Sequence, residues 1–174
     1  MIETILFIVG SIIIVWISIP SLRLSESHGF FRFFAWECIW GMFVLNARVW
    51  FVRPFAWNQV ISWLLLIASL LPLISGVHLL LKVGKPTDML EATTILVQSG
   101  IYRFIRHPLY ASLLYLAWGI FFKSPSLLGG CLVLVASAFL YATAIADERE
   151  CLIKFGDVYA KYINKTRMFI PFVF

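Results

Sequence analysis

Charged residues are scarce in this chain of 174 residues: they make up 13% of it, whereas hydrophobic residues make up 61%. Soluble globular domains average about 45–50% apolar and about 25% charged residues, so this composition excludes an ordinary soluble protein. The mean hydropathy of +0.93 agrees. The uncharged residues come in long runs and not in the weak alternation of a membrane β-barrel. The composition therefore predicts an all-α integral membrane protein.

Cysteine is scarce as well, and no Cys-x-x-Cys pair occurs. The three cysteines, Cys38, Cys131 and Cys151, lie far apart, which argues against a disulfide framework and against a zinc site. We therefore expect no metal. The formal net charge is +5, but the basic residues flank apolar segments, as they do in membrane proteins. Nucleic acid is therefore not an expected partner.

Apolar segments divide the chain into about five expected transmembrane helices, since a span needs about 20 residues. They are residues 4–22, 30–47, 57–81, 108–122 and 126–146. A cleaved signal peptide is the rival interpretation of the first segment. However, Glu3 stands where a signal peptide has a positively charged N-terminal region, and no small-residue cleavage site follows. The second segment is the weakest prediction of a transmembrane helix, because Arg32 and Glu37 interrupt its apolar run. An ionisable residue in an apolar run is by default a candidate site, so Glu37 becomes a candidate substrate-binding residue.

The last two apolar segments should form a helical hairpin, with residues 123–126 as the turn and Pro108 in the first helical turn. A hairpin returns the chain to the surface it left. Two polar clusters, Arg106-His107 before the hairpin and Asp147-Glu148 after it, should therefore be neighbours. This geometry makes residues 83–107, a long polar segment, a candidate functional region.

The C-terminal part should leave the membrane. An amphipathic stripe at three- and four-residue spacing predicts a further helix; it consists of Leu152, Phe155, Tyr159 and Tyr162. The tail, residues 165–171, should lie back on the body of the protein. With five spans, eleven of the 14 Lys and Arg residues fall on one side and three on the other. The positive-inside rule then places the N-terminus outside, and the C-terminus and residues 83–107 in the cytoplasm.

A motif in two halves surrounds the hairpin. The first half is Gly100-x-Tyr102-x-x-x-Arg106-His107-Pro108-x-Tyr110, and the second is Asp147-Glu148, Leu152, Phe155-Gly156, Tyr159, Tyr162 and Arg167-Met168-Phe169-Ile170-Pro171. Over about residues 93–171 this pattern resembles the signature of the isoprenylcysteine carboxyl methyltransferase and phospholipid methyltransferase superfamily of integral membrane methyltransferases. The usual Glu-Glu pair is Asp147-Glu148 here, and residues 1–90 carry no signature.

The resemblance implies methyl transfer from S-adenosylmethionine, bound without a Rossmann domain. The absence of a Gly-x-Gly-x-Gly loop from the sequence agrees with this. It further implies a cofactor pocket open to the cytosol and a lipophilic acceptor, a small molecule or a lipid, that enters from the bilayer. We expect N-terminal membrane helices over residues 1–90 and a methyltransferase core over residues 91–174.

The chemistry of the cofactor suggests roles for the motif. A carboxylate such as Glu148 can accept hydrogen bonds from the ammonium or ribose of the cofactor. Arg106 or His107 can pair with the carboxylate of the cofactor, and tyrosine rings can pack on its sulfonium or adenine. The candidate cofactor-binding residues are Leu96, Val97, Gly100, Tyr102, Arg106, His107, Pro108, Tyr110, Asp147 and Glu148.

The acceptor group stays open among carboxylate, amine and thiol. A carboxylate needs no base, whereas an amine or thiol must lose a proton, for which His107, Glu37 or His28 are candidates. Arg167 can clamp an anionic acceptor or bind a lipid phosphate, and is a candidate for both catalysis and substrate binding. The candidate catalytic residues are thus His107, Arg106 and Arg167.

Two other function classes compete. A haem-binding or redox membrane protein would pair His28, His78 and His107 across facing helices at similar depth. A structural or transport protein without chemistry would leave the joint spacing of the two motif halves unexplained.

Overall fold

A computed structural model describes residues 2–23, 27–86 and 93–171. Within these ranges the chain is helical and has no strand, only two isolated β-bridges. The α-helices are α1 (Ile2–Leu22), α2 (His28–Leu45), α3 (Trp57–Leu79), α4 (Pro108–Phe121), α5 (Leu127–Phe155) and α6 (Asp157–Ile163). Shorter elements are the 3-10 helices η1 (Ala47–Val49) and η3 (Gly100–Arg103), and the π-helix η2 (Leu80–Gly84), which continues α3.

Local signals explain where the helices begin and end. The Ser27 hydroxyl caps α2 by accepting from the backbone N–H of Phe30, at 3.2 Å. Ser126 caps α5 in the same way, and Pro108 stands in the first turn of α4, where its missing N–H costs nothing. Gly156, with a φ of 55°, separates α5 from α6.

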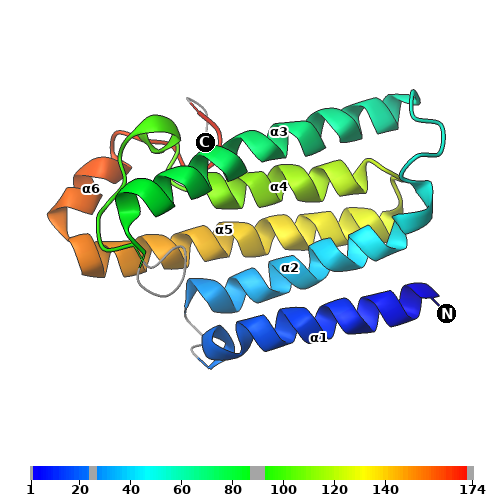
Figure 1. The fold of residues 1–174 in the computed structure, drawn as a ribbon, viewed down its shortest axis with the longest axis horizontal. Coiled ribbons are helices and arrows are strands. Elements are labelled where there is room, and N and C mark those ends of the chain that lie inside the picture. Colours follow the sequence, from blue (N-terminus) through cyan, green and yellow to red (C-terminus); the bar gives the residue numbers. More distant parts are fainter. Residues whose placement is uncertain (1, 24–26, 87–92, 172–174) are drawn as a thin grey trace.

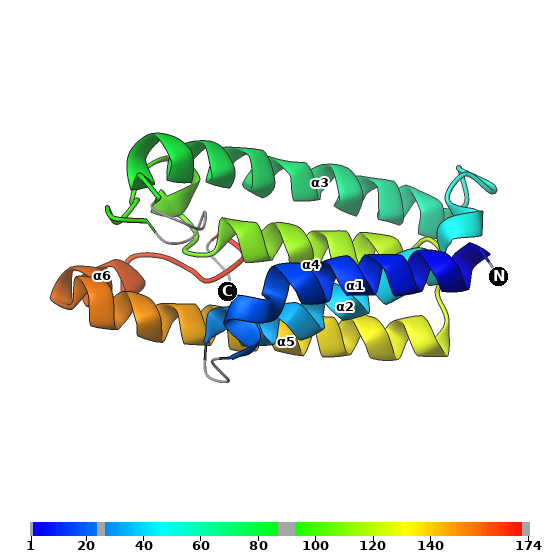
Figure 2. The same cartoon turned by 60° about the horizontal axis from the view of Figure 1, so that its bottom comes forward.

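The first five helices run up and down side by side, as Figures 1 and 2 show. α3 packs on α4, α2 packs on α5, and α1 lies at the outer edge against α2. The loop between α3 and α4, the start of α2 and helix α6 all gather at one end of the bundle, opposite the N-terminus (Figure 1). We call this end the polar end.

Three helices of the described part are long and apolar enough to cross a membrane: α1, α3 with its η2 extension, and α5. α4 is a shorter apolar helix. α1 exposes apolar side chains along most of its length, which suits a helix that faces lipid. The chain is therefore a multi-pass membrane protein with three candidate spans.

The opposite end of the bundle is held by a buried lysine. Lys123, 1% exposed, lies in the turn between α4 and α5. Its Nζ donates to Oε1 of Gln59 at 3.0 Å and lies 3.4 Å from the ring centroid of Trp63. This contact ties the hairpin turn to the start of α3.

Candidate functional site

The stretch before α4 is paired along its backbone with the C-terminal tail. The N–H of Arg106 donates to the carbonyl of Arg167 at 2.8 Å, and that of His107 donates to Met168 at 3.1 Å. The N–H of Arg167 donates in return to Phe104 at 3.0 Å. This parallel pairing confirms that the tail lies back on the body. It also holds Arg106 and His107 in place at the start of the hairpin.

The two polar clusters meet at the polar end, as the hairpin geometry predicts. Nε of Arg106 lies 2.7 Å from Oε1 of Glu148. The His107 ring bridges the acidic pair: Nδ1 lies 3.3 Å from Oδ2 of Asp147 and Nε2 lies 3.2 Å from Oε1 of Glu148. All four side chains are at most 19% exposed. Such shielding from water makes these contacts stronger than surface ion pairs.

The surroundings of His107 favour its protonated form. Burial by itself lowers the pKa of the ring, but the hydrogen bonds and charges of Asp147 and Glu148 outweigh it, and the pKa is raised above its ordinary value. Only an imidazolium can donate from both nitrogens at once. The ring also stacks on Tyr110, at 5.4 Å between centroids and an interplanar angle of 18°. His107 is therefore fixed in orientation, in surroundings that favour its charged form.

Arg106 connects the acidic pair to the C-terminal segment. Besides its contact with Glu148, its Nη1 donates to the carbonyls of Ile163 at 3.2 Å and Thr166 at 2.5 Å. These carbonyls lie at and just beyond the end of α6, where orphan acceptors need partners. The guanidinium thus positions α6 and the tail over the end of α5.

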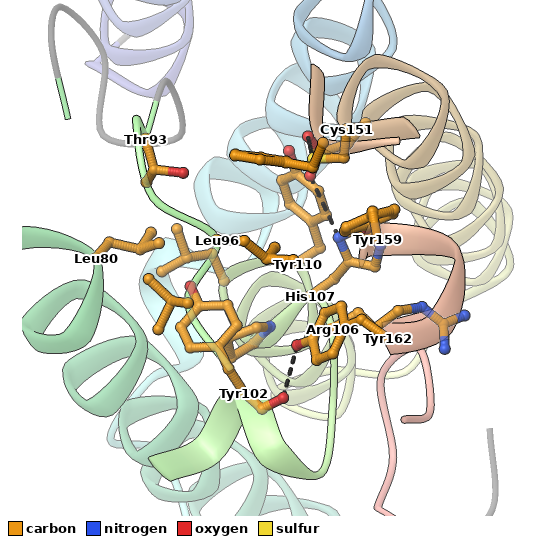
Figure 3. Close-up of a pocket in the computed structure, with 15 residues that line it drawn as sticks. Leu80, Thr93, Leu96, Tyr102, Arg106, His107, Tyr110, Cys151, Tyr159 and Tyr162 are labelled. Carbon is orange, nitrogen blue, oxygen red and sulfur yellow. Dashed lines mark hydrogen bonds and ion pairs between the residues drawn. The ribbon is translucent and has the colours of Figure 1, made fainter. Parts of the chain in front are cut away.

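A cavity opens beside this ion cluster (Figure 3). Its empty volume is about 550 Å³, a figure that includes solvent space at the open mouth. Its lining comes from the start of η2, the segment between η2 and α4, the start of α4, the end of α5 and α6. The lining residues are Leu80, Thr93, Leu96, Val97, Tyr102, Arg106, His107, Pro108, Leu109, Tyr110, Asp147, Cys151, Phe155, Tyr159 and Tyr162.

Tyrosines form one wall of this cavity. The Tyr162 hydroxyl donates to the backbone carbonyl of Tyr102 at 2.6 Å, a contact that Figure 3 shows as a dashed line joining α6 to η3. Burial raises the pKa of Tyr159 and of Tyr162 well above the ordinary tyrosine value. Both phenols therefore stay neutral and serve as hydrogen-bonding groups.

Eight of the ten residues predicted to bind a cofactor line the cavity: Leu96, Val97, Tyr102, Arg106, His107, Pro108, Tyr110 and Asp147. Glu148 does not; it lies behind the cavity and holds Arg106 and His107. Gly100 does not either. Its φ is 58°, and a Cβ there would lie 2.6 Å from Cδ1 of Leu79. Gly100 therefore allows the backbone turn to adopt this positive φ and to pack closely against Leu79 of α3.

The structure places the other two predicted site residues away from the cavity. Arg167 contributes backbone hydrogen bonds to the site, but its side chain is exposed and does not line the cavity. Glu37 lies on α2 in a different cavity, where its Oε2 accepts from the Ser11 hydroxyl at 2.8 Å.

Some lining residues were not predicted as site residues. Cys151 follows Asp147 by one helical turn, and this i, i+4 spacing could have identified it. The sequence marks Phe155, Tyr159 and Tyr162 only as members of the motif and of the amphipathic stripe. Leu80, Thr93 and Leu109 carry no sequence signal, because they reach the cavity through the packing of α3, the loop and α4.

The contacts of His28 and His107 argue against a haem held between these two histidines. Both ring nitrogens of His107 face carboxylates, and Nδ1 of His28 lies 2.6 Å from Oε2 of Glu150. His28, Asp147 and Glu150 bring potential ligand atoms within 4.8 Å of one another. Within this group, His28 and Glu150 form an ion pair that ties the start of α2 to α5, while Asp147 pairs with His107.

Comparison with known proteins places this site in a family. The sequence matches the phospholipid methyltransferase family over residues 57–156, more than half of the chain. It is also similar to methanethiol S-methyltransferase 1 of Bradyrhizobium diazoefficiens, with 29% identity over 73 residues. That alignment covers 41% of this chain and 24% of the relative, so the matched part spans about a quarter of the relative's length. No solved structure matches.

Proposed function

Because the chain belongs to the phospholipid methyltransferase family, we propose that it transfers a methyl group from S-adenosylmethionine to a lipophilic acceptor at the membrane surface. Family membership and the three candidate spans make it a membrane methyltransferase. The observation that carries the finer proposal is the cavity beside the Arg106–Glu148–His107–Asp147 cluster, which collects eight of the ten motif residues expected to bind the cofactor.

The cavity fits the chemistry of S-adenosylmethionine. The Asp147 carboxylate lines it and can accept from the ammonium or the ribose hydroxyls. Aromatic side chains such as Tyr110 and Tyr159 line it as well, and an aromatic face attracts a sulfonium with about 0.5–2 kcal/mol. The apolar side chains of Leu80 and Val97 suit the adenine ring. In this proposal Asp147, not Glu148, contacts the cofactor.

Bound S-adenosylmethionine supplies an electrophilic methyl group. The protein then contributes by positioning the two reactants, because holding them in line can lower the activation barrier by about 7–11 kcal/mol. Arg106 holds α6 and the tail, so that the tyrosine wall covers the cavity and excludes water. His107 orients Asp147 and Glu148 through its two ring nitrogens.

This assignment makes His107 a positioning residue and not the general base. An imidazolium held between two carboxylates has no lone pair with which to accept a proton. We therefore propose that the acceptor reaches the site as an anion that has already given its proton to water, either a carboxylate, as in isoprenylcysteine carboxyl methyltransferases, or a thiolate. The similarity to a methanethiol methyltransferase supports the thiolate, and an amine acceptor is the less favoured class.

The proposed topology has five spans, with α2 and α4 completing the bundle beside α1, α3 and α5. In this topology, the positive-inside rule supports an N-terminus outside and a cofactor cavity on the cytoplasmic side. Residues 91–174 then form the methyl-transfer core, and the helices of residues 1–90 form its membrane frame.

The decisive experiment is calorimetric binding of S-adenosylhomocysteine to the purified full chain, with native lipid retained. Asp147→Asn should weaken binding by about tenfold or more, the equivalent of about 1.4 kcal/mol, while the thermal midpoint falls much less than in Arg106→Ala. Asp157→Asn, which removes an exposed carboxylate from α6, is the matched control. Absence of binding by folded wild-type protein would overturn the assignment of the cofactor.

The acceptor requires a separate assay. Transfer of a labelled methyl group from S-adenosylmethionine should be measured with long-chain thiols, carboxylic acids and amines in parallel. Labelled thioether or ester products are expected. Labelling of amines alone would contradict the proposal of an anionic acceptor.

A further inference from the structure

A second cavity lies on the other side of the bundle, between α1, α2 and α5. Its empty volume is about 1080 Å³, including the part that opens outward. It shares no lining residue with the cavity beside His107. Its lining residues are Glu3, Thr4, Phe7, Glu37, Cys38, Gly41, Val44, Leu45 and Leu132. We call it the Glu37 groove.

Glu37 is the unusual feature of this groove. It lies nine residues into α2, which at 1.5 Å per residue is about 13 Å from the polar end of the helix. Its Oε2 accepts from the Ser11 hydroxyl at 2.8 Å. Its Oε1 is buried and has no hydrogen-bond partner among the described residues. An ionisable group at such depth in a membrane protein marks a binding site by default.

The rest of the groove is apolar or already neutralised. Glu3, at the far end, pairs with Arg48 at 2.5 Å. Phe7, Val44 and Leu132 offer apolar surface. Gly41 keeps the floor open, because the nearest atom that a Cβ would meet there is a Phe7 ring carbon at 3.7 Å. The groove therefore combines one unmet acceptor with an apolar channel.

We propose that the Glu37 groove binds a lipophilic primary amine, with its ammonium at Oε1 of Glu37 and its apolar body along Phe7, Val44 and Leu132. An ammonium satisfies the unmet acceptor and neutralises the carboxylate, and both gains are larger where water is excluded. An acyl chain alone would neither donate a hydrogen bond to Oε1 nor neutralise the carboxylate.

A second copy of this chain is a poorer occupant. α1 contains no lysine or arginine, and in α2 the sole such residue is Arg32. Arg32 is 7% exposed, and its guanidinium lies 4.8 Å from the ring centroid of Trp36. A symmetric copy packed through α1 and α2 would thus bring no available cation to the depth of Glu37.

The first test compares decylamine with decan-1-ol and decanoic acid, added to the purified full chain in detergent. Binding to the native state raises the thermal midpoint. Decylamine should raise it in wild type, more than either probe that lacks an ammonium, and Glu37→Gln should abolish this advantage. Gly41→Leu, which fills the channel but keeps the carboxylate, should abolish it too, whereas Ser11→Ala should retain it.

The second test uses the cysteine that each cavity contains. In a Cys131→Ser/Cys151→Ser variant, alkylation of Cys38 by N-ethylmaleimide should slow about tenfold when decylamine is present at ten times its Kd. In a Cys38→Ser/Cys131→Ser variant, Cys151 should be protected by S-adenosylhomocysteine and not by decylamine. Failure of the proposed cofactor site and failure of the amine site are thereby distinguished.

Three outcomes would overturn the proposal. Decan-1-ol and decylamine could shift the midpoint equally, which would reduce the groove to an apolar surface. The decylamine shift could survive Glu37→Gln in protein that still binds S-adenosylhomocysteine. Size-exclusion chromatography could reveal a dimer that Gly41→Leu dissociates, which would make the groove an interface between copies.

Discussion

Arg106 and Glu148 are 42 positions apart in the chain, yet Nε of Arg106 lies 2.7 Å from Oε1 of Glu148. The same oxygen lies 3.2 Å from Nε2 of His107. One carboxylate oxygen thus fixes the side chains of both Arg106 and His107 at the start of the α4–α5 hairpin. Removal of any partner should disturb the others, and this coupling guides the first two predictions.

Arg106→Ala should destabilise the fold strongly. It leaves the Glu148 carboxylate, 13% exposed, without its main cationic partner, a change that typically costs about 3–5 kcal/mol. It also leaves the carbonyls of Ile163 and Thr166 without a donor. Thermal unfolding in detergent measures the loss. Asp147→Asn should cost much less, and equal losses in the two variants would contradict the division of roles within the acidic pair.

The stability should fall as pH rises through the raised pKa of His107. The folded protein holds this proton more tightly than the unfolded chain, whose histidine pKa is about 6.5. The stabilisation is therefore complete below about pH 6.5 and is lost as pH rises through the folded value. His107→Gln should flatten this part of the profile of thermal midpoint against pH. A variant that keeps the wild-type slope would show that another group titrates.

Gly100→Ala should be destabilising, whereas Gly130→Ala should be tolerated. The positive φ at Gly100 costs an alanine about 1–2 kcal/mol, and its Cβ would meet Cδ1 of Leu79 at 2.6 Å. At Gly130, within α5, the nearest atom is a Phe121 ring carbon at 3.9 Å, and alanine favours the helix. Thermal midpoints of the two variants provide the comparison, and a neutral Gly100→Ala would refute the packing argument.

Lys123→Met should lower stability but leave cofactor binding intact. The change removes the donor to Gln59 and the cation over Trp63, and a buried acceptor left unsatisfied costs about 1–3 kcal/mol. Lys123 lies in the α4–α5 turn, at the end of the bundle opposite the cavity. The thermal midpoint should fall while the Kd for S-adenosylhomocysteine stays unchanged. A weakened Kd would show that the two ends are coupled.

The sequence by itself determined the class of the protein and the pairing of its two polar clusters. Long uncharged runs require helices in a membrane, because backbone groups there must be satisfied within the segment. The hairpin between Pro108 and Ala146 necessarily brings Arg106-His107 back to Asp147-Glu148. The spaced motif identified the family, which the match over residues 57–156 confirms.

Only the tertiary structure decided which side chain faces which space. Neighbouring residues on a helix point about 100° apart, at 3.6 residues per turn. The rotation of α5 in the bundle therefore sets Asp147 toward the cavity and Glu148 behind it. In the same way, the packing of α1 on α2 encloses Glu37 in a groove of its own. Spacing along the chain shows that residues share a region, but the neighbouring helices determine which surface each one meets.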